Sequence, residues 1–479
     1  MTQSAGIARI AITTFGLGAF ALCAGAQSDG NLDPTAIEQA LDDLKAALDG
    51  RWSYRHANRA DFDGAIAAVR KKAGAGMLVD ELGIEIHKII ALGIDGHSGV
   101  DGYELPVKRY LPFLIEPDGQ RFIAFNVDRT TFLAEGFPYL TQMDGRDVSE
   151  WCSAAAVLVP KGSPQYLRHR CLGRLRNLDL VRDLMKLPRK DTVDVVLVGA
   201  DGKTRRALTL RVASSSPAYG VWPRGRSRVL EGNLGYLRLA YMDKASSIKE
   251  IKQWMPKFRG TTGLIIDVRD NDGGDRDALR LIYSYLAAPS DPPRVFTAAA
   301  YRLHPAHKED HLAKGHFMYR SNAKEWTDAE RRAIAEFVKT FKPQWEPPKG
   351  QFSDWHYMAL SRLNDPDTYH YQRPVVVLMN GKCFSATDIF LAGLKRMKNV
   401  TLLGTPSAGG SAATQTVSLG ATPLRLRIGS MISFQSDGRL FDGHGARPDV
   451  VVEPAPEYYI GGPDNVLAEA LTALAALAR

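Results

Sequence analysis

Cysteines and long hydrophobic runs are both scarce in this 479-residue chain. It has four cysteines, no CxxC pair and no HExxH motif, so the sequence gives no sign of a zinc site. One apolar run, IAITTFGLGAFALCAGA, lies near the N-terminus, and no other stretch approaches the length that a membrane-spanning helix needs. We therefore expect no membrane span, no metal and no cofactor.

The N-terminal apolar run is typical of a secretory signal peptide. It follows Arg9, is short for a membrane span, and ends in Ala24-Gly25-Ala26. That ending fits an A-x-A cleavage site before Gln27. We expect residues 1–26 to be removed and the mature protein to be periplasmic or secreted.

Three cysteines remain after that cleavage: Cys152, Cys171 and Cys383. An oxidising compartment permits a Cys152–Cys171 disulfide, and three thiols must leave one unpaired. The sequence leaves this pairing open.

The chain carries a formal charge of +8, with basic and acidic residues interspersed. Its one dense basic cluster, RHRCLGRLR at residues 168–176, contains no aromatic residue on which a base could stack. We interpret the cluster as a solvated helix face and expect no nucleic-acid partner.

Periodicity divides the mature chain into three parts. Residues 27–104 show the three- and four-residue apolar spacing of a small helical domain. Residues 105–213 are β-rich, with a hairpin predicted around Asp201-Gly202, and the Ser/Pro/Gly-rich residues 214–231 read as a linker. Strands and helices alternate over residues 232–479, which predicts an α/β domain with a largely parallel sheet, interrupted by an insertion at about 303–372.

Two strand–turn–helix segments carry the candidate chemistry. In LIIDVRDNDGGDRDALRL, Gly273-Gly274 could point backbone N–H groups at an anion or simply form a tight turn. In PVVVLMNGKCFSATDIFLAGL, Ser385 and Asp388 have the spacing of a capping box. Ser385 could equally be a nucleophile at the positive end of a helix, with the N–H of Ala386 as an oxyanion donor. These segments alone leave both interpretations open.

Taken together, four motifs resemble the serine peptidase family of C-terminal (tail-specific) processing proteases and tricorn proteases. Besides LIIDVRDNDGG and the Ser385 segment, these are FLAEGFPYLTQMDGRDVSEW, which is similar to the family's PDZ-like module, and the C-terminal FDGHGARPDVVVEP. The resemblance implies a ClpP/crotonase-like α/β catalytic domain with a PDZ-like β-rich module and an N-terminal helical domain. It also implies peptide or protein substrates.

The same resemblance implies site residues. Ser385 takes the place of the nucleophile, and Gly274 and Ala386 take the places of the oxyanion donors. Processing proteases carry a catalytic lysine in a loop that reads GTPSAGGSA here, with Gly410 in its place. Lys382 and Lys395 are near in sequence, but neither matches the motif.

The tricorn-like branch uses instead a histidine from the preceding helical domain, which falls on His97 in IDGHSGV. His444 is the rival histidine. The acid that orients the histidine falls on Asp442, shorter by one methylene than the family's glutamate, and Asp449 is expected to be structural.

We therefore predict a serine-type endopeptidase with a Ser385–His97–Asp442 triad, an acyl-enzyme mechanism and a pH limb in the ordinary histidine range, roughly 6 to 7. One alternative is a catalytically silent peptide- or ligand-binding protein on the same scaffold. A second is a Ser–Lys dyad peptidase. An acyl-CoA enzyme is disfavoured because the signal peptide directs the chain away from cytosolic CoA substrates.

Overall fold

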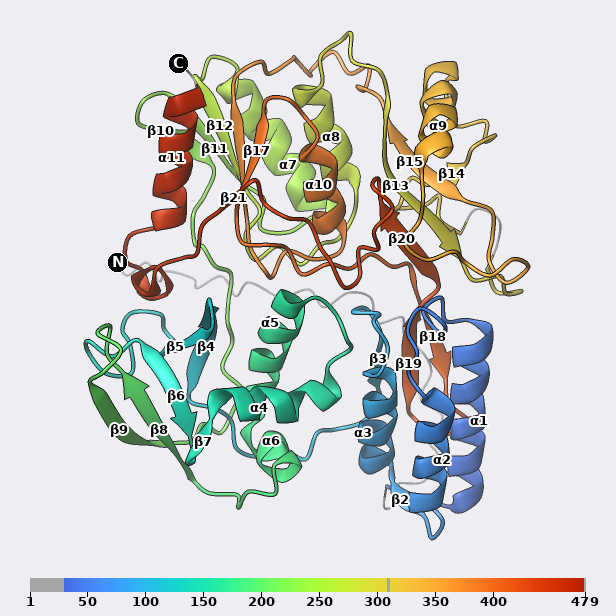
Figure 1. Cartoon of the computed structure of the whole chain (residues 1–479), viewed down its shortest axis with the longest axis vertical. Coiled ribbons are helices and arrows are strands. Elements are labelled where there is room, and N and C mark those ends of the chain that lie inside the picture. The colour runs from blue at the N-terminus through green and yellow to red at the C-terminus, as the bar shows by residue number, and fades with distance from the viewer. Residues whose placement is uncertain (1–29, 308–310, 478–479) are drawn as a thin grey trace, which may run out of the picture.

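The computed structural model describes residues 30–307 and 311–477 (Figure 1). The expected signal peptide, residues 1–26, lies outside these described residues. Within them, no helix combines the length and the apolar character needed to cross a membrane.

A six-stranded sheet forms the centre of the α/β region (Figure 1). In spatial order its strands are β10 (Arg228–Leu230), β11 (Leu234–Arg238), β12 (Gly263–Asp267), β16 (Val375–Met379), β17 (Val400–Gly404) and β21 (Val450–Val451). Neighbouring strands run parallel from β11 to β21, and β10 pairs with β11 in the antiparallel sense. Parallel strands joined through helices define an α/β domain, so the predicted fold class is confirmed.

Helices cover both faces of this central sheet. One face carries α7 (Lys244–Trp254), which continues into η2 (Met255–Phe258), together with α8 (Asp277–Leu286) and α10 (Ala386–Leu394); the other carries α11 (Asn465–Leu477), beyond η3 (Pro456–Ile460). Strand β12 shows why both faces are apolar. Ile266 belongs to the core on the α8 and α10 face, whereas Ile265, the residue before it in the strand, belongs to the core on the α11 face. Successive side chains of a strand point to opposite faces, so a fully covered strand must be apolar throughout.

A second, antiparallel sheet lies beside the first. Its order is β14 (Tyr319–Arg320), β15 (His356–Leu360), β13 (Arg294–Tyr301) and β20 (Met431–Gln435), and α9 (Asp328–Thr340) packs on it through Ile334. The predicted insertion, about 303–372, therefore supplies β14, β15 and the covering helix α9 to a sheet that it shares with β13 and β20 from outside the insertion.

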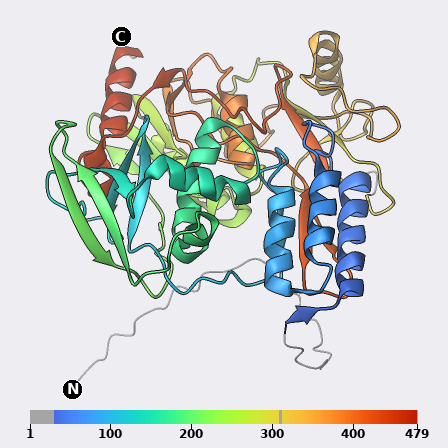
Figure 2. The same ribbon diagram turned by 60° about the horizontal axis from the view of Figure 1, so that its bottom comes forward.

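Three N-terminal helices pack on strands from the far end of the chain. The helices are α1 (Pro34–Gly50), α2 (Phe62–Lys72) and α3 (Val79–Ile90), joined by the short pair β1 (Asn31–Leu32) and β2 (Met77–Leu78). They share a core with the three-stranded sheet of β18 (Thr414–Ser418), β19 (Arg425–Gly429) and β3 (Gly99–Asp101). Figure 2 shows β19, in orange, beside the blue helices.

That arrangement differs from the alternation of strands and helices expected over residues 232–479, which includes the stretch LRLRIGSMISF at residues 424–434. Its two halves join different sheets, because β19 pairs with β3 and β20 pairs with β13. The pairing of β19 with β3 brings the end of the helical region, and with it His97, against the α/β region.

The β-rich module is a twisted antiparallel sheet with helices on one side. Its strands are β4 (Phe113–Asp118), β5 (Arg121–Asn126), β6 (Tyr139–Met143), β8 (Thr192–Val198) and β9 (Arg205–Arg211), with β7 (Arg146–Asp147) beside β6; its helices are α4 (Val148–Ala155), η1 (Ala156–Leu158), α5 (Pro164–Leu175) and α6 (Leu178–Leu184). The predicted hairpin is confirmed as β8 and β9, with Gly202 at a φ of 69° in the turn.

Cys152 in α4 and Cys171 in α5 are free thiols in this structure, as is Cys383. Burial raises the pKa of Cys152 to about 12 and that of Cys171 to about 11. Both thiols are therefore held in the protonated form, which is the unreactive one.

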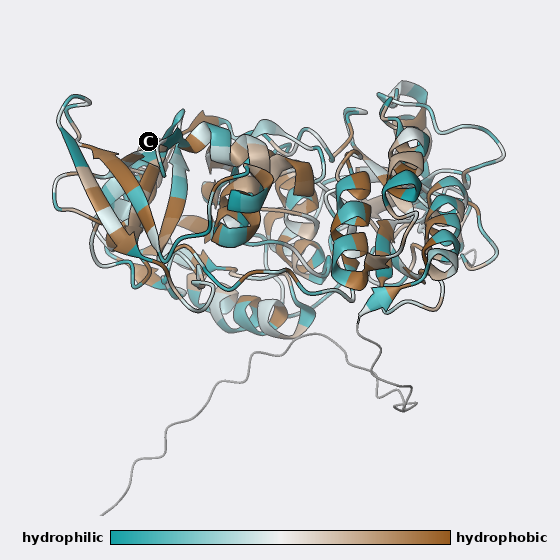
Figure 3. Ribbon diagram, turned by 90° about the horizontal axis from the view of Figure 1, so that it is seen from below, coloured by the Kyte–Doolittle hydropathy of each residue, from teal (hydrophilic) through white to brown (hydrophobic). Residues whose placement is uncertain are grey.

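Seen from below, the helices of the molecule alternate hydrophilic and hydrophobic stripes, as expected where one face of each helix is buried (Figure 3).

Candidate active site

Ser385 occupies a strained turn between β16 and α10. Its backbone has φ 59° and ψ −121°, a conformation that side chains other than glycine rarely adopt. Its hydroxyl makes no capping hydrogen bond to the helix, and Asp388 instead accepts hydrogen bonds from the hydroxyl of Ser407 and the N–H of Gly409. The capping-box interpretation is therefore wrong, although Ser385 does immediately precede the helix.

The hydroxyl of Ser385 contacts His97 instead. Ser385 Oγ lies 3.0 Å from His97 Nε2, although 288 residues separate the two in the sequence. The imidazole is stacked on the ring of Phe384 at a centroid distance of 4.5 Å and an interplanar angle of 26°. The stacking and the hydroxyl contact together fix the orientation of the imidazole.

The turn after β12 packs directly against the Ser385 turn. Gly273 has a φ of 108°, and a Cβ atom there would lie 2.6 Å from Cβ of Ser385, so only glycine fits. Its N–H donates to Oδ1 of Asn271 at 3.0 Å. The same Oδ1 accepts from Thr387 in the first turn of α10, so Asn271 ties the two turns together. The sequence analysis did not single out Asn271.

Two N–H groups beside Ser385 have no protein acceptor within residues 30–307 and 311–477. They belong to Gly274 and to Ala386, the first residue of α10. These are the two groups that the sequence analysis selected as oxyanion donors. Gly274 has a φ of 137° and lies against the backbone of Met242, which fixes its peptide plane.

Two buried carboxylates lie behind His97. Asp442 accepts hydrogen bonds from the hydroxyl of Tyr54 at 2.6 Å and from the N–H groups of Ser411 and Gly96 at 3.2 and 3.3 Å. Nδ1 of His97 has no hydrogen-bond partner among the described residues. Burial is the main cause that raises the pKa of Asp442 to about 7, and its hydrogen bond from Tyr54 acts in the opposite direction.

Asp95 is the second carboxylate, and the sequence analysis missed it. It accepts from Trp52 Nε1 at 2.9 Å, from the N–H of Gly429 at 2.8 Å and from the hydroxyl of Ser98. Its Oδ1 also accepts from the N–H of His97 at 3.0 Å, so Asp95 shapes the loop that carries the imidazole. Residue spacing gave no signal for this role, because two of its donors, Trp52 and Gly429, come from distant parts of the chain.

Asp95, His97 and Asp442 together have the donor types of a metal site. One carboxylate oxygen each from Asp95 and Asp442 and one ring nitrogen of His97 lie within 4.8 Å of one another. The carboxylate oxygens, however, already accept hydrogen bonds from protein donors. The arrangement therefore fits hydrogen bonding around a histidine better than metal ligation.

Burial in this site lowers the pKa of His97 to about 4, opposed by the negative charge of Asp95. This differs from the sequence expectation of a limb at 6 to 7, because the ordinary pKa of histidine is that of a solvated imidazole, whereas His97 is desolvated. The imidazole is therefore neutral near pH 7, which is the form that can accept a proton from Ser385.

The two lysines near Ser385 in sequence are held elsewhere. Lys382 forms an ion pair with Glu116 of β4 and lies 3.4 Å from Asp270. Lys395 donates to the carbonyl of Arg447 at 2.7 Å. The carboxylates beside Lys382 raise its pKa further despite its burial, so it stays charged.

The remaining candidates also lie apart from Ser385. Nε2 of His444 is 2.9 Å from Oε1 of Gln344. Oδ2 of Asp449 accepts a hydrogen bond from the N–H of Leu402 at 2.9 Å, which fits the structural role expected of Asp449. At Gly410, a Cβ atom would lie 2.2 Å from the ring of Phe384. The ring that orients His97 therefore fills the space that a lysine would need.

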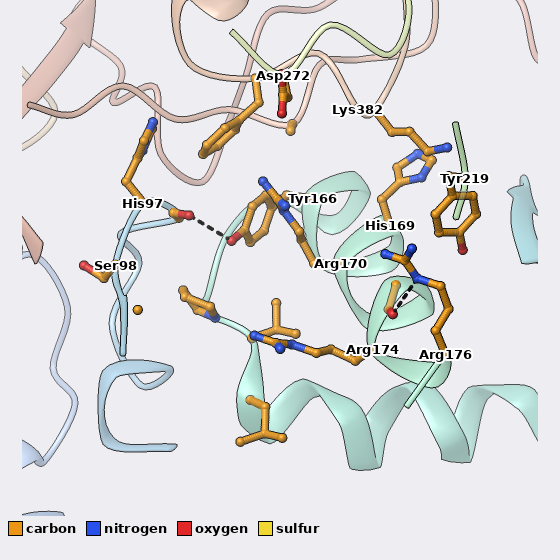
Figure 4. Close-up of a pocket in the computed structure, with 18 of the residues that line it drawn as sticks. His97, Ser98, Tyr166, His169, Arg170, Arg174, Arg176, Tyr219, Asp272 and Lys382 are labelled. Atoms are coloured by element: carbon orange, nitrogen blue, oxygen red, sulfur yellow. Dashed lines mark hydrogen bonds between the residues drawn. The ribbon is translucent and has the colours of Figure 1, made fainter. Parts of the chain in front are cut away.

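Ser385 and His97 open onto a cavity of about 1060 Å³ between the α/β region, the helical region and α5 (Figure 4). Arg170, Arg174 and Arg176 line it from the α5 side. Arg170 is exposed, as the predicted solvated helix face requires, whereas Arg174 and Arg176 are only partly exposed, and packing turns all three toward the cavity.

Known proteins resemble this chain in sequence and in fold. The model of peptidase family S41 matches residues 233–452. A carboxy-terminal-processing protease of Bartonella bacilliformis is 34% identical over 91 residues, which are 19% of this chain and 21% of the relative. The matched stretch thus spans about a fifth of that relative's length.

Solved structures extend the likeness to nearly the whole chain. The structure of mature CPAF complexed with lactacystin has a TM-score of 0.63 at 16% identity, covering 93% of this chain and 99% of that one. A putative peptidase from Parabacteroides merdae has a TM-score of 0.50 at 14% identity, covering 91% and 96%. At these identities the likeness is one of fold.

Proposed function

We propose that the chain, whose residues 233–452 match the model of peptidase family S41, is a serine-type peptidase in which Ser385 is the nucleophile and His97 the general base. The observation that carries the proposal is the 3.0 Å contact between Ser385 Oγ and His97 Nε2. A hydroxyl needs an adjacent neutral base to become a nucleophile near pH 7, and the lowered pKa of His97 supports that role.

The proposed reaction proceeds through an acyl-enzyme. Ser385 Oγ attacks the carbonyl carbon of the scissile peptide bond while His97 Nε2 takes its proton. The same proton then passes from His97 to the leaving amine, and the C–N bond breaks. A water molecule, deprotonated by His97, attacks the ester, and Ser385 recovers its proton from the imidazolium as the acid product leaves.

The negative oxygen that forms during each attack needs preorganised donors. We assign this role to the N–H groups of Gly274 and Ala386, which are unoccupied by protein acceptors among the described residues. Ala386 also begins α10, whose N-terminus carries partial positive charge. Substitution of a hole donor typically costs about 10²–10³ in kcat, but backbone donors leave no side chain to remove.

Asp442 is the proposed third member of the triad. Its carboxylate lies within 4.8 Å of a ring nitrogen of His97 and would stabilise the imidazolium that forms when the serine proton is taken. Nδ1 of His97 is the nitrogen left unpartnered, so a small rotation of the imidazole or an intervening water would complete the link.

A fluorophosphonate probe tests the nucleophile directly. It should label the wild-type protein on Ser385, identified by peptide mass spectrometry, and label neither Ser385→Ala nor His97→Ala at a comparable rate. Ser153→Ala, on the exposed side of α4, should label like the wild type. Absence of labelling in the wild type, together with peptide binding without hydrolysis, would instead identify a silent binding protein.

The domain organisation and the location of the protein are part of the same proposal. We assign residues 105–213 to a PDZ-like module that binds extended peptide by strand addition, and residues 27–104 to the helical domain that supplies His97. We also propose export with cleavage before Gln27. N-terminal sequencing of the protein secreted by its host would overturn the last point if the chain began at Met1.

A further inference from the structure

One face of α5 is basic and is turned toward Ser385. The cavity-lining residues of this helix recur at three- and four-residue spacing, which places them on a single face: Tyr166, His169, Arg170, Gly173 and Arg174. Figure 4 shows Arg170 beside Tyr166 on the His97 side of the cavity, with Arg174 extending beneath them.

The guanidinium groups on this wall have no carboxylate partner. Within the described residues, no Asp or Glu oxygen lies within 4.0 Å of the guanidinium nitrogens of Arg170, Arg174 or Arg176. Arg174 instead contacts Nε2 of His87 at 3.1 Å, and Arg176 donates to the carbonyls of Gly173 and Pro217. Among the described residues, no ion pair with an acidic side chain therefore neutralises the positive charge of these arginines at the cavity wall.

The acidic residues that line the cavity do not change this balance. Asp270 is engaged by Lys382 and by Nδ2 of Asn380. Asp101 and Asp272 are exposed to solvent, where their charges are screened.

Arg170 also lies close to the reacting atoms. Its guanidinium carbon is 5.3 Å from the centroid of the Phe384 ring and 5.3 Å from that of Tyr166. Phe384 directly precedes Ser385 and stacks on His97. Aromatic rings hold the guanidinium plane without using its N–H donors, which stay available for a ligand.

We propose that Arg170, supported by Arg174, forms a subsite for an acidic side chain of the peptide substrate, at a position adjacent to the scissile bond. This inference rests on the proposed peptidase function. A planar guanidinium binds a carboxylate through two parallel N–H···O bonds, which no amide side chain can reproduce. Substrates with Asp or Glu at that position should therefore be cleaved faster than their amide counterparts.

A matched peptide series tests the subsite. Internally quenched peptides, acetylated and amidated at their ends, would carry Glu or Gln at one position, scanned on both sides of the cleaved bond. The wild type should show a kcat/KM for Glu at least about tenfold above that for Gln at one position, as a charge-assisted hydrogen bond predicts. In Arg170→Gln this ratio should fall to about one, and in Arg174→Gln it should fall in part.

The control lies on the same helix. Arg168 does not line the cavity and donates to Oε1 of Gln120, so Arg168→Gln should keep the wild-type ratio. Because each variant is judged by a ratio of two substrates, partial loss of folded protein does not affect the outcome. Equal cleavage of Glu and Gln peptides by the wild type, or a ratio that survives Arg170→Gln and Arg174→Gln, would overturn the subsite.

A binding measurement separates failure of the subsite from failure of the peptidase. Fluorescence anisotropy with Ser385→Ala should show tighter binding of the Glu peptides, and Arg170→Gln in that background should abolish the difference. If the wild type hydrolyses nothing but the Ser385→Ala protein still discriminates, the peptidase proposal fails and the subsite stands. A preference only for peptides with a free C-terminus, and none for Glu, would assign the arginines to the chain end and overturn the proposal.

Discussion

His97 and Lys382 line the same cavity as Ser385 but differ in the groups that contact their nitrogens. Both are partly buried. Glu116 and Asp270 surround the ammonium of Lys382, whereas the ring nitrogens of His97 meet one hydroxyl and no carboxylate hydrogen bond. The pKa of Lys382 is therefore raised, while burial lowers the pKa of His97 to about 4.

The difference shows that burial alone does not make a base. Desolvation disfavours both charged forms, but in the lysine's case two neighbouring carboxylates more than offset it. A charged, ion-paired ammonium has no lone pair with which to accept a proton from Ser385. The neutral imidazole has one, at hydrogen-bonding distance.

Removal of the imidazole of His97 should give the largest loss of activity. His97→Ala should lower kcat by several orders of magnitude, nearly to the level of Ser385→Ala, because the two residues act as one unit. The double variant should be little worse than either single one. Steady-state kinetics on a quenched peptide would measure all three, and substantial activity in His97→Ala would break the comparison.

Local motifs and long-range packing contributed unequally to what the sequence could predict. The proposed nucleophile and the neighbouring N–H groups lie within short segments, so Ser385, Gly274 and Ala386 could be selected there, and His97 could be selected by resemblance. Tyr54 bonds Asp442 across 388 residues, and no local pattern announces such a contact. For the same reason no local pattern showed that Arg170, Arg174 and Arg176 of the basic cluster line the cavity, because tertiary packing places them there.

Asp442→Asn should have the next largest effect. An amide cannot stabilise the imidazolium as a carboxylate does, and the loss for the equivalent change in a serine protease triad is about 10⁴ in kcat. We expect a fall of roughly 10²–10⁴ in kcat with KM little changed. Asp95→Asn is the matched comparison, since Asp95 bonds the backbone of His97 and should act mainly on stability, measured by thermal unfolding.

The pH dependence should show two steps rather than one. Asp442, with a pKa raised to about 7, is ionised only above that pH, so activity should rise as pH increases through about 7. His97, with a pKa lowered to about 4, should account for a second loss as pH falls toward 4, because protonation removes the base. In Asp442→Asn the step near 7 should vanish, and a wild-type profile with a single step near 6.5 would contradict this account.

Lys382→Met should act on stability more than on chemistry. Removing the lysine leaves the buried Glu116 and the partly buried Asp270 without their ion-pair partner, and breaking a buried pair typically costs about 3–5 kcal/mol. Chemical denaturation should therefore show a marked loss of unfolding free energy. Lys382→Met with Glu116→Gln should recover part of that loss. A Lys382→Met protein that stays fully folded but no longer labels with the fluorophosphonate would favour a Ser–Lys dyad.

The smallest effect should come from His444 and Lys395, the candidates that are not among the residues lining the cavity. Nε2 of His444 meets only Gln344 among the described residues, at the surface, and Lys395 lies 3.3 Å from Asp449 in a partly exposed ion pair. Exposed pairs of this kind contribute about 0–1 kcal/mol. His444→Ala and Lys395→Ala should therefore retain wild-type kcat/KM within about twofold and unfold within about 1 kcal/mol of the wild type. A large loss of activity in His444→Ala, with His97→Ala unaffected, would separate the helical region from catalysis and reverse the assignment of the base.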